Sequence, residues 1–119
     1  MLVTVPNADL AELMASSVLL SRMWPSACQE VAMLIHVLRI SDPSLADALH
    51  VGLVSVMTPP SGRPSAEVLL AHKSAVLSAV ARHEAGGRIT APHNRPNEIR
   101  WLEVTDLAVA GYSALRGTG

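Results

Sequence analysis

The fold prediction depends most on residues 65–90, which run SAEVLLAHKSAVLSAVARHEAGGRIT. Alanine and leucine are frequent in this stretch, and glycine is absent until Gly86 and Gly87, where a helix C-terminal cap belongs. The stretch predicts a long helix over 65–85, with a break near His72 as the alternative to one continuous helix. One face of that helix would carry Leu69, Val76 and Val80, and another would carry Glu67, Ser74, Ser78 and Arg82.

A β-hairpin is predicted directly after this helix. Residues 88–91 and 99–104 are short and partly β-branched, and a proline-rich tip separates them. Two such runs around a short tip are typical of a hairpin, here over 88–104. Thr105-Asp106 then caps a last predicted helix over 105–116.

Two helices are predicted near the start of the chain. Asn7 is a good N-cap for a helix over 8–23. Ser26-x-x-Gln29 has the spacing of a capping box before a helix over 27–40. Because the second helix is apolar almost all round, we expect it to be buried together with His36.

A third helix is expected to begin at Pro43 and to end near Met57, before the proline-rich loop at 58–64. The fold class predicted from the sequence is therefore mainly α with a small β-hairpin. We expect a single domain over 1–119, with a helical N-terminal part at 8–57, a helix and hairpin at 65–104, and a C-terminal helix at 105–116.

Composition excludes several classes of protein. Half of the 119 residues are hydrophobic and 16% are charged, which excludes an intrinsically disordered chain. The single cysteine, Cys28, excludes an internal disulfide framework and a multi-cysteine zinc site. No apolar run approaches the roughly 20 residues of a membrane span, and the first residues lack the basic start of a signal peptide. We expect a cytoplasmic protein with no membrane association.

The charges are unevenly distributed along the chain. The formal net charge is −1 at pH 7, yet residues 72–100 hold five of the nine lysines and arginines and two acidic residues. Three of the five histidines also lie in this segment. A locally basic segment favours an anionic partner more than the overall charge does.

Residues 73–90 and the segment Trp101-Leu102-Glu103-Val104-Thr105-Asp106 resemble the recognition helix and wing of winged helix-turn-helix proteins, in particular MarR-type regulators. The resemblance implies a transcriptional regulator that binds duplex DNA, with helix 73–85 in the major groove and hairpin 88–104 as the wing. The DNA-binding residues expected on this basis are Lys73, Ser74, Ser78, Arg82, Arg88, His93, Arg95 and Arg100.

A second segment, Ser41 to Val51, also looks like the first helix and turn of a Cro-type or MarR-type helix-turn-helix. Its recognition helix would be 52–58, which has no basic residue and stops at Pro59. The basic segment is therefore the better candidate for a DNA-binding element.

Signals for catalysis and metal binding are poor. HExxH, CxxC and nucleophile-elbow patterns are all absent from the sequence. We expect no enzyme, no cofactor and no metal site. Asp47 and His50 lie at helical spacing, but such pairs are usually structural. The role of Cys28 stays open between a reactive thiol and a small buried side chain.

The partners follow from these features. The MarR-type resemblance implies a homodimer, for which we expect pairing through the two terminal helices, because Val18, Leu19 and Leu20 exceed one core-facing stripe. The alternative function is a small non-enzymatic helical adaptor or inhibitor, of the kind that phages and mobile elements encode, that binds another protein. Low net charge and an apolar N-terminal half favour this alternative.

Overall fold

The computed structural model describes residues 1–41, 44–57, 66–90, 92–110 and 112–113, with only the backbone for 93, 112 and 113. The predicted start at Pro43, the predicted loop at 58–64 and the end of the predicted last helix lie outside these ranges. The elements are, in chain order, β1 (Leu2–Thr4), α1 (Ala8–Ala15), α2 (Ser17–Met23), α3 (Cys28–Ile40), α4 (Leu45–His50), β2 (Ser55–Met57), β3 (Glu67–His72), β4 (Ala75–Arg82), the 3-10 helices η1 (Pro92–Asn94) and η2 (Pro96–Glu98), β5 (Trp101–Val109) and β6 (Tyr112–Ser113).

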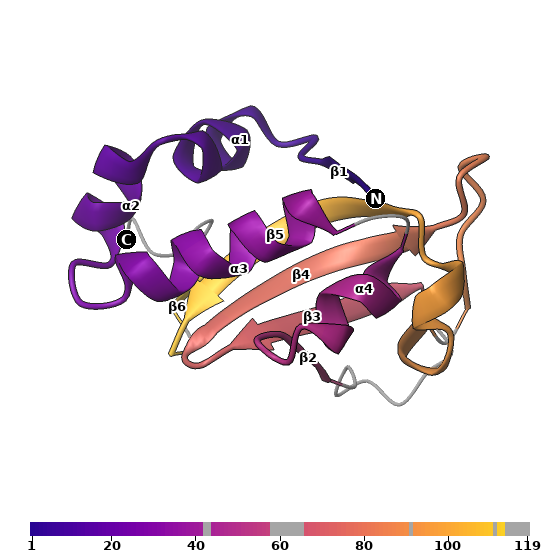
Figure 1. Cartoon of the computed structure of the whole chain (residues 1–119). Helices are drawn as coiled ribbons and strands as arrows, with labels where there is room; N and C mark the ends of the chain where they lie inside the picture. Colours follow the sequence, from indigo (N-terminus) through magenta and orange to yellow (C-terminus); the bar gives the residue numbers. More distant parts are fainter. Residues whose placement is uncertain (42–43, 58–65, 91, 111, 114–119) are drawn as a thin grey trace.

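The fold is mixed α/β, so the prediction of a mainly helical protein with a small hairpin is wrong. The strands form a sheet in the order β1-β5-β4-β3-β2, and β6 pairs with β5. β1 runs parallel to β5, and the other neighbours are antiparallel. Helices α3 and α4 lie across one face of the sheet, and α1 and α2 lie beside α3 (Figure 1). The core lies between this helical layer and the sheet.

The first predicted helix exists as two shorter ones. The Asn7 side chain accepts a hydrogen bond of 2.9 Å from Leu10 N, so the predicted N-cap is confirmed. Ser16 interrupts the helix because it adopts an extended backbone, and its hydroxyl accepts from Leu19 N at 3.2 Å. Ser16 is thus the N-cap of α2, and the predicted helix over 8–23 is divided at this residue.

Helix α3 has almost the predicted bounds, but it is not buried on every side. Its buried residues follow helical spacing and are Val31, Leu34, Ile35, Val37 and Leu38. Met33, His36 and Ile40 are exposed, so the expectation of a buried His36 is wrong. The capping box at Ser26 is also absent, because the N-cap residue is Ala27 and no side chain caps the helix.

Helix α4 is much shorter than predicted. Ser44 N donates to the Asp47 carboxylate at 3.1 Å, which closes the first turn of the helix. The helix ends at His50, and Gly52 then adopts a φ of +84°, which glycine tolerates without strain. Residues 55–57 are strand β2. The predicted end of the helix near Met57 is therefore wrong, and residues 52–57 do not form the recognition helix expected at 52–58.

The predicted helix over 65–85 is the hairpin β3–β4. Lys73 and Ser74 form its two-residue turn, and the strands pair from His72 with Ala75 to Glu67 with Val80. The inward residues of β4 recur with a period of two and are all 0% exposed: Ala75, Leu77, Ala79 and Ala81. Small alanines on this side leave room for α3, which contacts β4. Tertiary packing has overridden the helix propensity of alanine.

The hairpin predicted as a wing over 88–104 also differs from what the structure shows. Between Arg88 and Arg100 the chain forms the 3-10 helices η1 and η2, and only an isolated bridge joins Arg82 to Arg88. The predicted second strand is real but continues through Val109 as β5, so the helix over 105–116 is wrong wherever the structure describes it. Thr105 is an extra residue in β5, because Val104 pairs with Ala79 and Asp106 pairs with Ser78.

Candidate functional site

The residues expected to bind DNA do not lie on one surface. Lys73 and Ser74 form the turn at one end of the β3–β4 hairpin, Ser78 lies in the middle of β4, and Arg82 ends that strand. An extended strand rises about 3.3 Å per residue, which separates Lys73 from Arg82 by roughly 30 Å along the sheet. A helix would have gathered these side chains on one face within three turns.

The turn at Lys73 is held by helix α3. Glu30 accepts hydrogen bonds from the Ser74 hydroxyl and from Ser74 N, the latter at 3.2 Å. These bonds lower the pKa of the Glu30 carboxyl, and the nearby charges of Lys73 and His72 lower it further. Lys73 has a φ of 55°, a conformation that favours glycine, so the Glu30 contact stabilises a strained turn.

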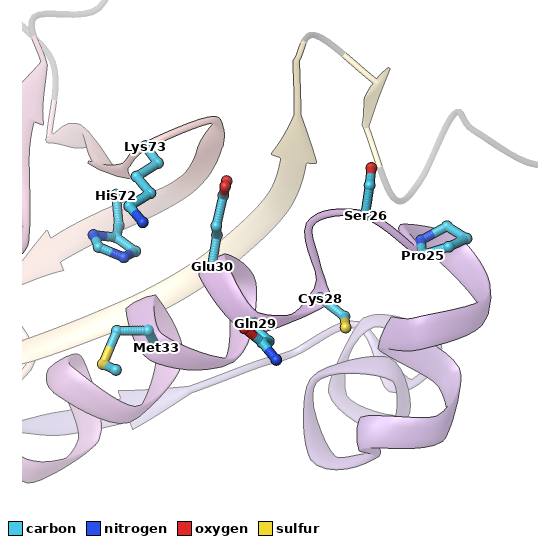
Figure 2. A pocket seen from close by; sticks show the side chains of 8 residues that line it. All are labelled: Pro25, Ser26, Cys28, Gln29, Glu30, Met33, His72 and Lys73. Carbon is cyan, nitrogen blue, oxygen red and sulfur yellow. The ribbon is translucent and has the colours of Figure 1, made fainter.

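A cleft of about 480 Å³ is lined by residues of this turn and of the start of α3. Figure 2 shows Glu30 between His72 and Lys73 on one side and Pro25 and Ser26 on the other. Cys28 lies at the opposite end of the cleft from His72, so the thiol and the imidazole do not form a nucleophile–base pair (Figure 2).

Two polar side chains of the cleft, those of His72 and Glu30, have structural partners. His72 Nδ1 donates to the Leu53 carbonyl at 2.7 Å, and Glu30 holds the turn. Within the ranges that the structure describes, no three His, Cys, Asp or Glu side chains are placed to hold a metal ion. The cleft is best explained as the junction between α3 and the β3–β4 hairpin.

The remaining basic residues lie at the other end of the sheet. Arg82 is largely occupied: its Nε lies 3.3 Å from the Glu103 carboxylate, its Nη1 donates to Gly86 O at 2.7 Å, and its guanidinium lies over the Trp101 ring. Arg88 is exposed beside Arg82, to which it is joined by the backbone bridge. Arg100 N donates to Arg82 O, so this residue also lies at that end of β4.

The last two expected residues belong to the 3-10 segment. Arg95 Nε lies 3.7 Å from the Glu98 carboxylate, an exposed ion pair within one turn of chain. His93 lies in η1, and its side chain is not among those described. The structure therefore brings Arg82, Arg88 and Arg100 together and leaves Lys73 and Ser74 apart from them.

One surface without an assigned role is the face of the sheet opposite the helices, which we call the open face. Residues paired across antiparallel strands share a face, so the pairing identifies its members. The outward side chains of the three central strands are Glu67, Leu69 and Ala71 on β3, Val76, Ser78, Val80 and Arg82 on β4, and Trp101, Glu103, Asp106 and Ala108 on β5. Met57 on β2 and Leu2 on β1 extend the face to both edges.

The apolar side chains of the open face are separate from the core. Inward residues of the edge strands, Val3 and Val56, pack against the core cluster, whereas Leu69, Val76 and Val80 do not. Among the described helices, α3 contacts the sheet on its inward side, and Figure 1 shows α4 on that same side. A sheet face left to water is usually polar, so this composition requires an explanation.

The surface expected to pair two copies through terminal helices is not present as predicted. On α2, Val18 is exposed, but Leu20 is buried in the core. Leu107 and Val109, which were expected on a C-terminal helix, are buried residues of β5.

No family model, curated protein or solved structure matches this chain. The longest described helix, α3, has 13 residues, and none of the helices in the described ranges is long and apolar enough to cross a bilayer.

Sequence reasoning missed Met57, Ala71 and Ala108 as members of a surface, and it placed Leu69, Val76 and Val80 on one face of a helix. The available signal was the pair of β-branched valines at 76 and 80, together with Val68, which favour strands over helices.

Proposed function

We propose that this protein is a small non-enzymatic protein-binding module, and that its binding surface is the open face of the sheet. The observation that carries the proposal is the row of Leu69, Ala71, Val76, Val80 and Ala108 across the three central strands, outside the core. Charged side chains lie among the apolar ones, since Glu67 and Glu103 flank Val80, and a mixture of apolar and polar area is the usual composition of a protein–protein interface.

The charges of the open face support a protein partner over duplex DNA. Glu67, Glu103 and Asp106 point out of the same face as Arg82, and Arg82 is already paired with Glu103. Affinity for DNA comes mainly from cations that meet phosphates, and carboxylates on the same surface oppose it.

A photo-crosslinking amino acid tests this proposal. We would place it at Met57, a residue 44% exposed at the rim of the open face, and at Ala32, an exposed position on α3 that serves as the matched control. In cells that express the full chain, irradiation is expected to yield protein adducts from position 57 that a Leu69→Glu substitution abolishes. No adduct should depend on the open face when the label is at position 32.

Two results would overturn the proposal. One is the absence of any protein adduct from position 57, or adducts unaffected by Leu69→Glu. The other is binding of a random DNA duplex at low salt that weakens with Arg88→Ala and Arg100→Ala, because phosphate contacts give a steep salt dependence that shrinks as cations are removed.

A further inference from the structure

A groove lies between α3 and the junction of α1 with α2. Ala15 and Ser17 line it on the junction side, and Ala32, His36 and Arg39 line it on α3. We call it the helix groove. These helices lie on the covered side of the sheet, opposite the open face (Figure 1). The volume of the helix groove is about 210 Å³. This is the share of about seven water molecules in the liquid, so the groove has room for a small molecule.

The helix groove lies where the chain breaks between α1 and α2. Ser16 adopts an extended backbone, so the chain leaves the helical path between Ala15 and Ser17. These two residues are small, and so is Ala32, which lines the groove on α3. Short side chains on both sides leave a space that longer ones would fill.

The floor of the helix groove is apolar. Met14, Leu20 and Ile35 line it, and all three are buried members of the core cluster. The parts of these side chains that line the groove have no apolar neighbour above them. An apolar group placed over them would leave water and contact the core directly.

The rim of the helix groove is basic. His36 and Arg39 are exposed and lie three residues apart on α3, so they are neighbours on one face of the helix. Among the residues that the structure describes, neither side chain forms an ion pair, and none of the lining residues is acidic. A guanidinium donates two parallel hydrogen bonds to a carboxylate, and an imidazole N–H can donate a third. The rim is therefore complementary to a carboxylate.

We propose that the helix groove binds a small monocarboxylate whose apolar body is one ring or a short chain. The carboxylate lies against Arg39 and His36, and the apolar body covers Leu20 and Ile35. The basic rim favours an acid over a neutral molecule of the same shape, and the apolar floor favours an acid with a hydrocarbon body over acetate. This site is separate from the open face, so the inference goes beyond the proposed function and does not depend on it.

A titration with benzoate tests the inference, because benzoate has one carboxylate and one ring. Nuclear magnetic resonance of the ¹³C-methyl-labelled full chain should show shifts of the Leu20, Ala32 and Ile35 methyl signals. We expect a Kd of about 1 mM, which is ordinary for a ligand of about nine non-hydrogen atoms. Benzamide has nearly the same shape without the charge, and acetate lacks the ring. Each should bind at least about tenfold more weakly than benzoate.

Substitutions in the helix groove test the two halves of the site separately. Arg39→Gln removes the guanidinium and should raise the Kd for benzoate at least about fivefold. Ala32→Leu places a larger side chain in the groove and should abolish benzoate binding. Arg22→Gln is the matched control, because Arg22 is an exposed arginine of α2 that does not line the groove, and it should leave the Kd unchanged. Circular dichroism checks the fold of each variant, and Arg39→Gln decides the matter if Ala32→Leu unfolds.

Four results would overturn the inference. They are no methyl shift with benzoate at about 20 mM, benzamide that binds as tightly as benzoate, an unchanged Kd in Arg39→Gln, and shifts confined to residues outside the groove. Failure of the proposed function is distinguished from these results, since crosslinking from position 57 reports only on the open face.

Discussion

Helix α3 and strand β4 contact each other in the core and have similar compositions, yet the sequence predicts the first correctly and the second wrongly. In α3 the buried residues Val31, Leu34, Ile35 and Leu38 follow the helical spacing, and His36 is the one polar residue between them. In β4 every second residue is buried, but the intervening positions include Val76 and Val80. Apolar residues on both faces weaken the alternation by which a strand is normally recognised.

The apolar residues at the outward positions of β4 concealed this strand in the sequence, and the same residues mark the open face as a surface of interest. If the outward positions of β4 were polar, the period of two would have been visible in the sequence and the open face would need no partner. Because they are apolar, the segment resembles a helix in composition, and the folded sheet keeps an apolar face outside its core.

The largest expected effect distinguishes the two faces of β4. Leu77→Ala removes a side chain that is 0% exposed and should cost about 2–5 kcal/mol of unfolding free energy, measured by urea denaturation. Val76→Ala, one residue away on the open face, should cost less than about 1 kcal/mol in the monomer. A helix over 73–85 with Val76 in its core requires the opposite order, and that result would contradict the strand assignment.

The next effect concerns the part of the chain where helical prediction succeeded. Asn7→Ala removes the side-chain acceptor for Leu10 N and should destabilise the protein by about 1 kcal/mol. Asn97→Ala, an exposed asparagine in η2 with no described capping bond, is the control and should change stability by less than about 0.5 kcal/mol. Equal losses of unfolding free energy for the two substitutions would show that the Asn7 cap does not stabilise the protein.

Glycine substitutions in the turn before β4 and in α3 should change the unfolding free energy in opposite directions. Lys73→Gly places glycine at a φ of 55° and should stabilise the protein by up to about 1 kcal/mol, because the positive φ strains a lysine. Ala32→Gly lies inside α3 and should cost about 0.5–1 kcal/mol. Thermal unfolding of both variants measures the difference. Destabilisation by Lys73→Gly of about 1 kcal/mol would indicate a helix at residue 73.

The smallest effect is a pH dependence at the contact between α3 and the turn. Hydrogen bonds from Ser74 lower the pKa of Glu30 below the ordinary value of 4.5, so the folded state favours the carboxylate. The resulting stability is complete above pH 4.5 and is lost as the pH falls through the lower pKa of the folded state. The stability difference between the wild type and Glu30→Gln, from urea denaturation at each pH, should therefore shrink below pH 4.5. In a Ser74→Ala background this change should be much smaller, and an unchanged profile there would contradict the assigned cause.

The limits of sequence analysis for this chain have physical causes. Helix α1 was predictable because a local cap and a helical apolar spacing coincide in it, and α3 was predictable because its buried residues follow the helical spacing. The break at Ser16, the end of α4 and the β3–β4 hairpin depend on packing between distant segments, which local propensity does not report. The candidate site was missed for the same reason, since the open face consists of residues from separate strands that only the strand register brings together.

The central claim is that β4 is a strand whose valines point away from the core onto the open face. Nuclear Overhauser spectra of ¹³C-labelled protein test it without any substitution. The account predicts contacts from the methyl groups of Val76 to Ala71 and Ala108, its neighbours across the sheet, and none to the methyl groups of Val31, which is 0% exposed in the core. Contacts from the Val76 and Val80 methyl groups to the buried residues of α3, with none to Ala71 or Ala108, would contradict it.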